Sequence, residues 1–264
     1  MKAQPGSSIE PGDPEPRRGP SQATKPMAAL SPRFKARMAG VFQFLEGLTS
    51  AGGQVVILGS LVVAGSAAMT ATNILAHQQL FWVGFASSLM GVAFHLAWAF
   101  LLYELLKPVN RSLSFLALCV MLVGCAMQAL SSLLYLAPLL VLQGGSALSA
   151  FTPQQVQDLA LVFLTLNARA YDIYLVFFGL WCVLIGFLIF RSTFLPRILG
   201  VLLMIDGVGW MLYLFPPLAQ QLFPLIAVAA GLAEFSLLLW LLVVGCNAER
   251  WKEQEAAAAA SLRT

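Results

Sequence analysis

Residues 113–142 read LSFLALCVMLVGCAMQALSSLLYLAPLLVL, thirty positions without an aspartate, glutamate, lysine, arginine or histidine. An uncharged apolar run of this length is typical of a transmembrane helix, because about 20 apolar residues cross the hydrocarbon core of a bilayer. The rest of the chain has the same character, since 59% of its residues are hydrophobic and only 10% are charged. This composition excludes an ordinary soluble domain, in which about a quarter of the residues carry charge.

Six apolar runs follow one another along the chain, and each predicts one transmembrane helix. They cover about 38–64, 80–106, 113–142, 168–190, 195–215 and 222–246. We therefore predict an all-α, polytopic membrane protein whose six-helix transmembrane domain spans residues 34–247. Residues 1–33 are rich in proline and glycine and are predicted to be a disordered cytoplasmic tail, while residues 248–264 form a cytoplasmic C-terminal tail.

Nearly all lysines and arginines that flank the predicted spans fall on one side of the membrane. With six spans, a single positive charge, Arg169, falls near the other side. Because basic loops stay in the cytoplasm, both termini are predicted to be cytoplasmic. The charges that share the cytoplasmic side are Arg33, Lys35, Arg37, Lys107, Arg111, Arg191, Arg197, Arg250, Lys252 and Arg263. Glu104, beside Lys107, is expected to be a solvated end charge.

The predicted outer connections are the longest segments between spans. Residues 65–79 could form a short interfacial helix. Thr152, Pro153 and Gln155 fit a capping box with proline at the first helical position, so a helix is expected to begin near Pro153. That helix could break near Asn167 or run straight into the fourth span, and both alternatives stay open. Further on, Pro216 and Pro217 are expected to end the fifth span.

Small and polar residues recur at steps of three and four in several spans, which places them on one face of each helix. A polar side chain that faces lipid has no partner, so these faces are predicted to point inward. Glycines also recur at every seventh position, as in the pair Gly179 and Gly186, and such stripes let helices approach closely. The inward sets are Gln43, Glu46, Ser50 and Gly53; Gly84, Ser88, Gly91, His95 and Trp98; and Gly124, Gln128, Ser131 and Tyr135.

Four ionisable residues lie near the middle of the predicted spans, and they are the best candidates for a functional site. They are Glu46, His95, Asp206 and Glu234. A charged side chain at the centre of a span costs roughly 3 kcal/mol on insertion scales, so such residues mark a site by default. Arg169 and Asp172 join them as candidates at the outer end of the fourth span, where they could pair with each other, or Arg169 could pair with a carboxylate on another helix.

Two interpretations of these residues stay open. In the functional one, Glu46, His95 and Glu234 converge on a cavity and relay protons or hold a cation. In the structural one, each group is protonated or bonded to a neighbouring helix and only fixes packing. His95 is expected to pack or to hydrogen-bond rather than to act as a ligand. Asp206 lies beside Gly207, where a close backbone could satisfy it.

Several classes of chemistry lack their residues. The chain has two histidines, no CxxC pair, and no HExxH, GxSxG or phosphate-binding glycine motif, so we expect no catalytic residue, no metal and no cofactor. The net charge of +3 sits at span ends instead of on a basic face, which argues against nucleic acid as a partner. The lipid bilayer is the expected partner, while homo-oligomerisation and a small-molecule or ion ligand are left open.

Four stretches carry a resemblance to a known family. They are ARMAG (36–40), LLYELLKPVNRSLSFLA (101–117), GFLIFRSTFLPRILGVLLMIDGVGW (186–210) and AEFSLLLWLLVVGCN (233–247). Together they resemble a bacterial family of integral membrane proteins catalogued as domain of unknown function 4386. The resemblance covers about residues 35–247 and implies a multi-pass protein of the bacterial inner membrane. It brings no established activity, and at Asp206 the family has a small residue.

Three hypotheses of function follow. The first is an integral inner-membrane protein without catalytic chemistry. The second is a small proton-coupled transporter or channel-like protein that uses Glu46, Glu234 and His95. The third is a non-catalytic interaction or sensory module that binds a lipid or a partner through residues 65–79 and 143–167.

Overall fold

A computed structural model describes residues 31–261, and within them the chain is helical without a strand. Six helices are long and apolar enough to cross a membrane, so the predicted all-α, multi-pass architecture is confirmed. Of the tail predicted over residues 1–33, positions 1–30 lie outside the described residues. The spanning helices run over Pro32–Leu61, Gln78–Leu106, Arg111–Leu142, Pro153–Arg191, Arg197–Leu214 and Pro216–Val244.

The first and last of these spans contain π-helical turns. The first consists of α1 (Pro32–Ser50), the π-helical η1 (Ala51–Ile57) and α2 (Leu58–Leu61), and the last of α8 (Pro216–Leu239) and the π-helical η4 (Trp240–Val244). Such turns are uncommon and often lie at functional sites. The remaining elements are α3 (Ala67–Ala76), α4 (Gln78–Leu106), α5 (Arg111–Leu142), η2 (Ser146–Leu148), α6 (Pro153–Arg191), α7 (Arg197–Met211), η3 (Leu212–Leu214) and α9 (Ala248–Ser261).

Helix α6 settles one alternative that the sequence left open. Thr152 and Gln155 form the predicted capping box, and the helix continues without a break from Pro153 to Arg191. It does not break near Asn167, because that side chain donates to the backbone oxygen of Ser131 in α5, 2.7 Å away. The fourth span is therefore longer than predicted, with 39 residues.

The fifth span ends at Leu214, just before Pro216 and Pro217, as expected. The two prolines also open α8 as its first residues. Proline suits this position because the first helical residues have no intrahelical partner for their N–H groups. The sixth span consequently begins at Pro216 and not near residue 222.

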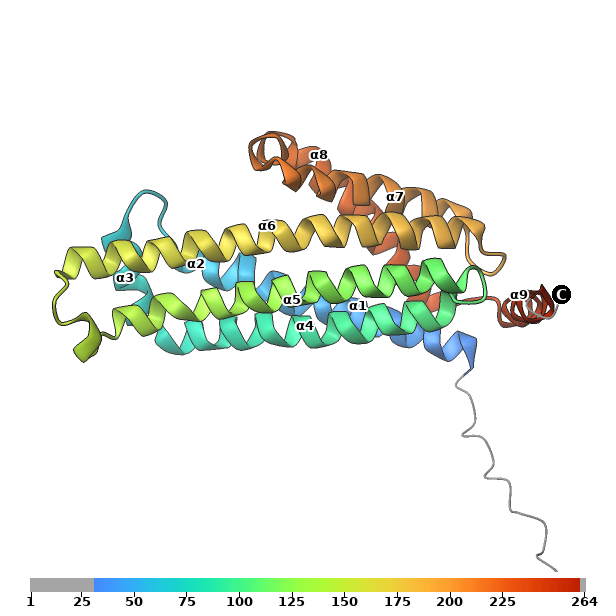
Figure 1. The fold of residues 1–264 in the computed structure, drawn as a ribbon, viewed down its shortest axis with the longest axis horizontal. Helices are drawn as coiled ribbons and strands as arrows, with labels where there is room; N and C mark the ends of the chain where they lie inside the picture. Colours follow the sequence, from blue (N-terminus) through green and yellow to red (C-terminus); the bar gives the residue numbers. More distant parts are fainter. Residues whose placement is uncertain (1–30, 262–264) are drawn as a thin grey trace, which may run out of the picture. The chain divides into compact units, whose positions relative to one another are not determined.

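The helices pack through the predicted small-residue faces, with α5 and α7 running beside α6 and α1 against α4 (Figure 1). Two glycine pairs bring α6 and α7 together. A methyl group added at Gly179 would lie 2.5 Å from the backbone oxygen of Gly207, and one at Gly186 would lie 2.7 Å from that of Gly200. The inward sets predicted for the first three spans are also buried, apart from the partly buried Glu46.

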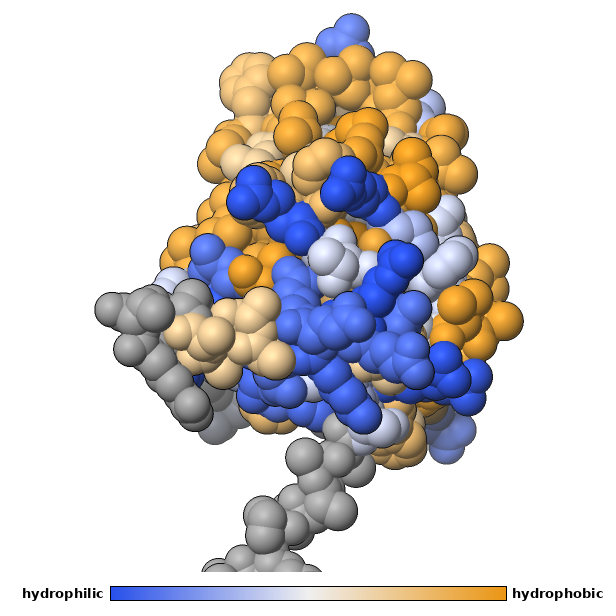
Figure 2. Space-filling view, turned by 90° about the vertical axis from the view of Figure 1, so that its right-hand side faces the viewer, coloured by the Kyte–Doolittle hydropathy of each residue, from blue (hydrophilic) through white to orange (hydrophobic). Residues whose placement is uncertain are grey.

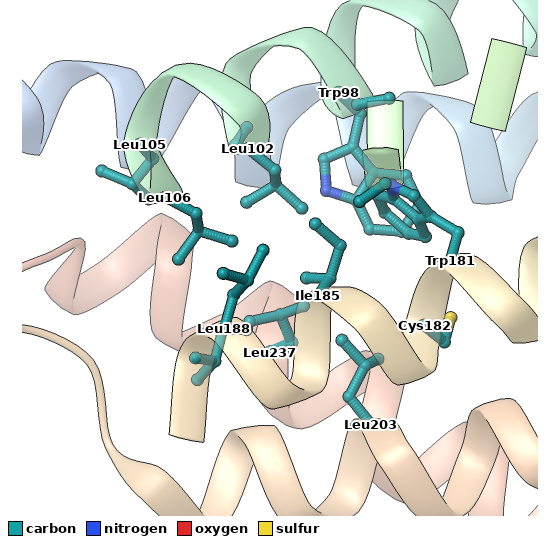
Figure 3. Close-up of a cluster of buried hydrophobic side chains, with 14 of the residues drawn as sticks. Trp98, Leu102, Leu105, Leu106, Trp181, Cys182, Ile185, Leu188, Leu203 and Leu237 are labelled. Atoms are coloured by element: carbon teal, nitrogen blue, oxygen red, sulfur yellow. The ribbon is translucent and has the colours of Figure 1, made fainter. Parts of the chain in front are cut away.

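The apolar core is densest toward the end of the bundle that carries α9. Figure 3 shows tryptophan and leucine side chains of α4 meeting those of α6, with single leucines added by α7 and α8. Trp98 and Trp181 cross edge-to-face with ring centroids 4.7 Å apart. The opposite surfaces of the spanning helices expose large apolar side chains, which suits contact with lipid.

Polar residues gather at the end that carries α9, whereas apolar residues dominate the sides (Figure 2). Helix α9 is attached to this end through Trp251, whose indole N–H donates to the backbone oxygen of Leu105 at 2.8 Å. Glu104 was expected to be a solvated end charge, but it is not. It bridges Lys35 at 2.9 Å and Lys107 at 2.8 Å with its side chain only 20% exposed.

Candidate functional site

Glu46 of α1 and His95 of α4 form a buried pair. The Glu46 Oε1 lies 3.5 Å from His95 Nδ1, and the Tyr174 hydroxyl of α6 lies 3.3 Å from the same nitrogen. His95 is fully buried, whereas the Glu46 side chain keeps 13% exposure. With a proton on Nδ1 the imidazole can donate to Glu46, and without it Nδ1 can accept from the tyrosine. Nδ1 thus has a partner in either tautomer of the ring.

Aromatic rings surround His95. The rings of Trp98, Tyr174, Phe178 and Trp181 lie 5.1 to 5.9 Å from the imidazole centroid. Nε2 points into these surroundings and makes no hydrogen bond. The ring therefore packs among aromatic side chains and hydrogen-bonds through Nδ1.

Glu234 of α8 lies in the same region. Its Oε1 accepts a hydrogen bond from the Trp210 indole at 3.3 Å, and its backbone oxygen accepts one from the Gln43 amide at 3.0 Å. The carboxylate also interacts electrostatically with Asp206 and Glu46. Glu46, His95, Asp206 and Glu234, which come from four helices, therefore share one electrostatic neighbourhood.

Asp206 of α7 is the exception to this pattern of partners. It is fully buried, and neither carboxylate oxygen accepts a hydrogen bond. Cys182 and Trp210 are its polar neighbours. We expected a nearby backbone group to hydrogen-bond to the Asp206 carboxylate, and this expectation was wrong. Gly207 lies instead against the backbone oxygen of Gly179 in α6.

Arg169 and Asp172 pair with each other at 2.9 Å, which settles the alternative of a partner on another helix. Both line a cavity of about 460 Å³ between the first span and α6, on the side that is predicted to be the outer one. Tyr171 lines the same cavity, and its hydroxyl interacts electrostatically with Glu46 and Glu234. Its ring lies 5.1 Å from that of Tyr174, the hydrogen-bond partner of His95. The two tyrosines thus connect the cavity with the buried pair.

The sequence profile of the family described as Domain of unknown function (DUF4386) matches residues 38–245. The chain belongs to this family. No curated protein and no solved structure matches it. The matched range contains the whole buried set, so these residues belong to the DUF4386 domain and not to its flanking segments.

Sequence reasoning missed several members of the site in this DUF4386 chain. Tyr171, Tyr174 and Trp210 each contact or face the buried acids, yet none was a candidate. A signal existed, because Asn167, Tyr171 and Tyr174 recur at steps of four and three and continue to Phe178 and Trp181. In the described part of the chain, no cluster of three or more histidine, cysteine or acidic side chains could hold a metal ion.

Proposed function

We propose that this protein moves protons across the bacterial inner membrane as a small transporter or channel-like protein, with Glu46, His95 and Glu234 as the groups that bind and release them. The observation that carries the proposal is the Glu46–His95 pair, buried within the spans at 3.5 Å and electrostatically linked to Glu234. A pair of this kind is expensive in a membrane, and ionisable groups within spans commonly serve proton or ion pathways.

The neighbouring residues support a proton path from the outer side. Tyr171 borders the outer cavity, and Tyr174 follows it toward His95. A hydroxyl both donates and accepts, so a tyrosine can pass a proton between neighbours without becoming charged itself. The proposed order is therefore outer cavity, tyrosines, His95 and Glu46, with Glu234 as the next acceptor.

The interaction-module hypothesis draws less support. Helix α3, which makes up most of the outer segment 65–79, is held by its own bonds. Thr70 accepts from the backbone N–H of Val63 at 2.9 Å, and Asn73 donates to the backbone oxygen of Leu61 at 3.2 Å. Because these side chains are already hydrogen-bonded within the protein, fewer donors and acceptors are left to bind a partner.

Proton flux tests the proposal directly. The full-length protein is reconstituted into liposomes loaded with a pH-sensitive dye, and a potassium diffusion potential is imposed. We expect internal acidification several-fold faster than in protein-free liposomes, and its loss in Glu46→Gln and Glu234→Gln. Glu253→Gln serves as the control, because that acid is exposed on α9 and lies outside the proposed path. Equal rates in protein-containing and protein-free liposomes, or full activity of both glutamine variants, would refute the proposal.

A further inference from the structure

A groove opens sideways between the first span and α8, and it reaches Glu234. Its volume is about 480 Å³, within the range of small-molecule sites. Much of the lining is apolar and exposed on the outside of the bundle, including Leu48 at 60%, Val56 at 66% and Phe235 at 65%. Because the sides of a spanning bundle meet lipid, this groove opens toward the bilayer and not toward water.

Glycine keeps the groove open. Gly47 lines it, and a methyl group added there would meet nothing within 4 Å. The next turns belong to the π-helical η1, whose Ala51, Gly52 and Val56 also line the groove. Small residues and a locally widened helix thus leave a space that ordinary side chains in a regular α-helix would fill.

The polar part of the lining offers acceptors. Gln43 is 6% exposed, and its Oε1 accepts no hydrogen bond, while its amide nitrogen is already used by the backbone of Glu234. Glu234 adds a carboxylate, and Glu46 and Asp206 add negative charge behind it. Of the described residues that line the groove, none is a lysine or arginine. A complementary molecule therefore carries N–H donors and a positive charge on an apolar body.

We propose that this groove binds a lipophilic ammonium compound that arrives from the bilayer, with its ammonium group at Glu234 and Gln43 and its apolar body against Leu48 and Phe235. The inference rests on the proposed proton function and names the second solute that would move in exchange. Proton and ammonium group then compete for the Glu234 carboxylate, which makes their binding mutually exclusive.

Binding is tested with three probes that share one apolar body. Fluorophenylbutylammonium, fluorophenylbutanol and fluorophenylbutyrate are titrated into the full-length protein in a neutral detergent and followed by fluorine NMR. A charge-assisted hydrogen bond in a dry site predicts that the ammonium probe binds about tenfold more tightly than the alcohol. The carboxylate probe is expected to bind more weakly still, because it meets like charge.

Two variants separate the head-group site from the apolar groove. Glu234→Gln should reduce ammonium affinity about tenfold and leave alcohol affinity unchanged, because it removes charge and keeps shape. Gly47→Leu should block all three probes by filling the groove. Gly231→Leu is the control, since Gly231 belongs to α8, has the same open surroundings and lines neither this groove nor the cavity beside Tyr171.

Three outcomes would overturn the inference: equal binding of the three probes, ammonium binding that survives Gly47→Leu, or ammonium affinity unaffected by Glu234→Gln. The first would mean that the groove holds only a lipid or detergent chain. Thermal unfolding of each variant verifies that it is folded. The binding assay needs no proton gradient, so its failure is distinguishable from failure of the proton-flux test.

Discussion

The most informative single atom in this protein is the His95 Nδ1. Two groups of different chemistry, the Glu46 carboxylate and the Tyr174 hydroxyl, approach it from different helices. A histidine that only filled space would not need both. The arrangement gives Nδ1 a partner in either neutral tautomer, because it can donate to the carboxylate or accept from the hydroxyl.

Removing the Tyr174 hydroxyl tests this arrangement. Tyr174→Phe keeps the ring among its aromatic neighbours and deletes one buried hydrogen bond, so the free energy of unfolding should fall by about 1 kcal/mol. Denaturation in mixed micelles measures it. Tyr103→Phe is the control, because no hydrogen bond of the described residues involves its hydroxyl. Equal stability of both variants would show that the His95–Tyr174 bond contributes nothing.

For a substitution of Asp206 we expect the opposite effect, an increase in stability. Its carboxylate is fully buried without a hydrogen bond, so Asp206→Ala should raise the free energy of unfolding by about 1–3 kcal/mol. Asp172→Ala, which removes a paired acid at the outer end, should not stabilise the protein. Both effects are read from the same denaturation curves. Destabilisation by Asp206→Ala would mean that the carboxylate has a stabilising partner.

At the scale of elements, the α6–α7 contact depends on glycine. The backbones touch at Gly179–Gly207 and Gly186–Gly200, where no side chain fits. This contact also places Asp206 and Trp210 on α7 opposite the aromatic stripe of α6, so packing and site geometry are linked. Within a membrane such close approach replaces the hydrophobic force that drives helix packing in water.

A single methyl group should disturb this contact. In Gly179→Ala the new Cβ would meet a backbone oxygen, which cannot move aside, so the helices must separate at a cost of about 1–3 kcal/mol. Gly231→Ala in α8 meets open space and should be neutral or slightly stabilising. Thermal melting of the two variants provides the comparison. A similar melting temperature for both would exclude a tight α6–α7 contact.

At the scale of the whole molecule, polar residues gather at the end that carries α9 (Figure 2). Six antiparallel spans would place every basic span end on this side, and the positive-inside rule predicts that it faces the cytoplasm. In a cysteine-free background, Glu253→Cys should react with a membrane-impermeant maleimide only after cell lysis. Ser149→Cys at the opposite end should react in intact cells, and the reverse pattern would overturn the orientation.

The native Cys246 should be a slow thiol in such labelling. It lies beyond the last span, and burial raises its pKa to about 11, with Arg33 partly offsetting the shift. The thiol is therefore protonated at neutral pH, and its alkylation rate should climb steadily as pH rises toward that value. A cysteine placed at the exposed Lys252 should react far faster at pH 7. Comparable rates for the two would contradict the burial of Cys246.

The sequence by itself determined the number of spans, the inward faces of the first three and the start of α6, because hydropathy, helical period and the Thr152 cap are properties of neighbouring residues. It also identified the buried ionisable residues, since each interrupts an apolar run. Only the tertiary structure decided that Glu46 meets His95, that Asp206 has no hydrogen-bond partner and that Glu234 borders a groove. Those facts depend on how each helix is rotated and how closely it approaches the next, which glycine contacts such as Gly179–Gly207 set between residues far apart in the chain.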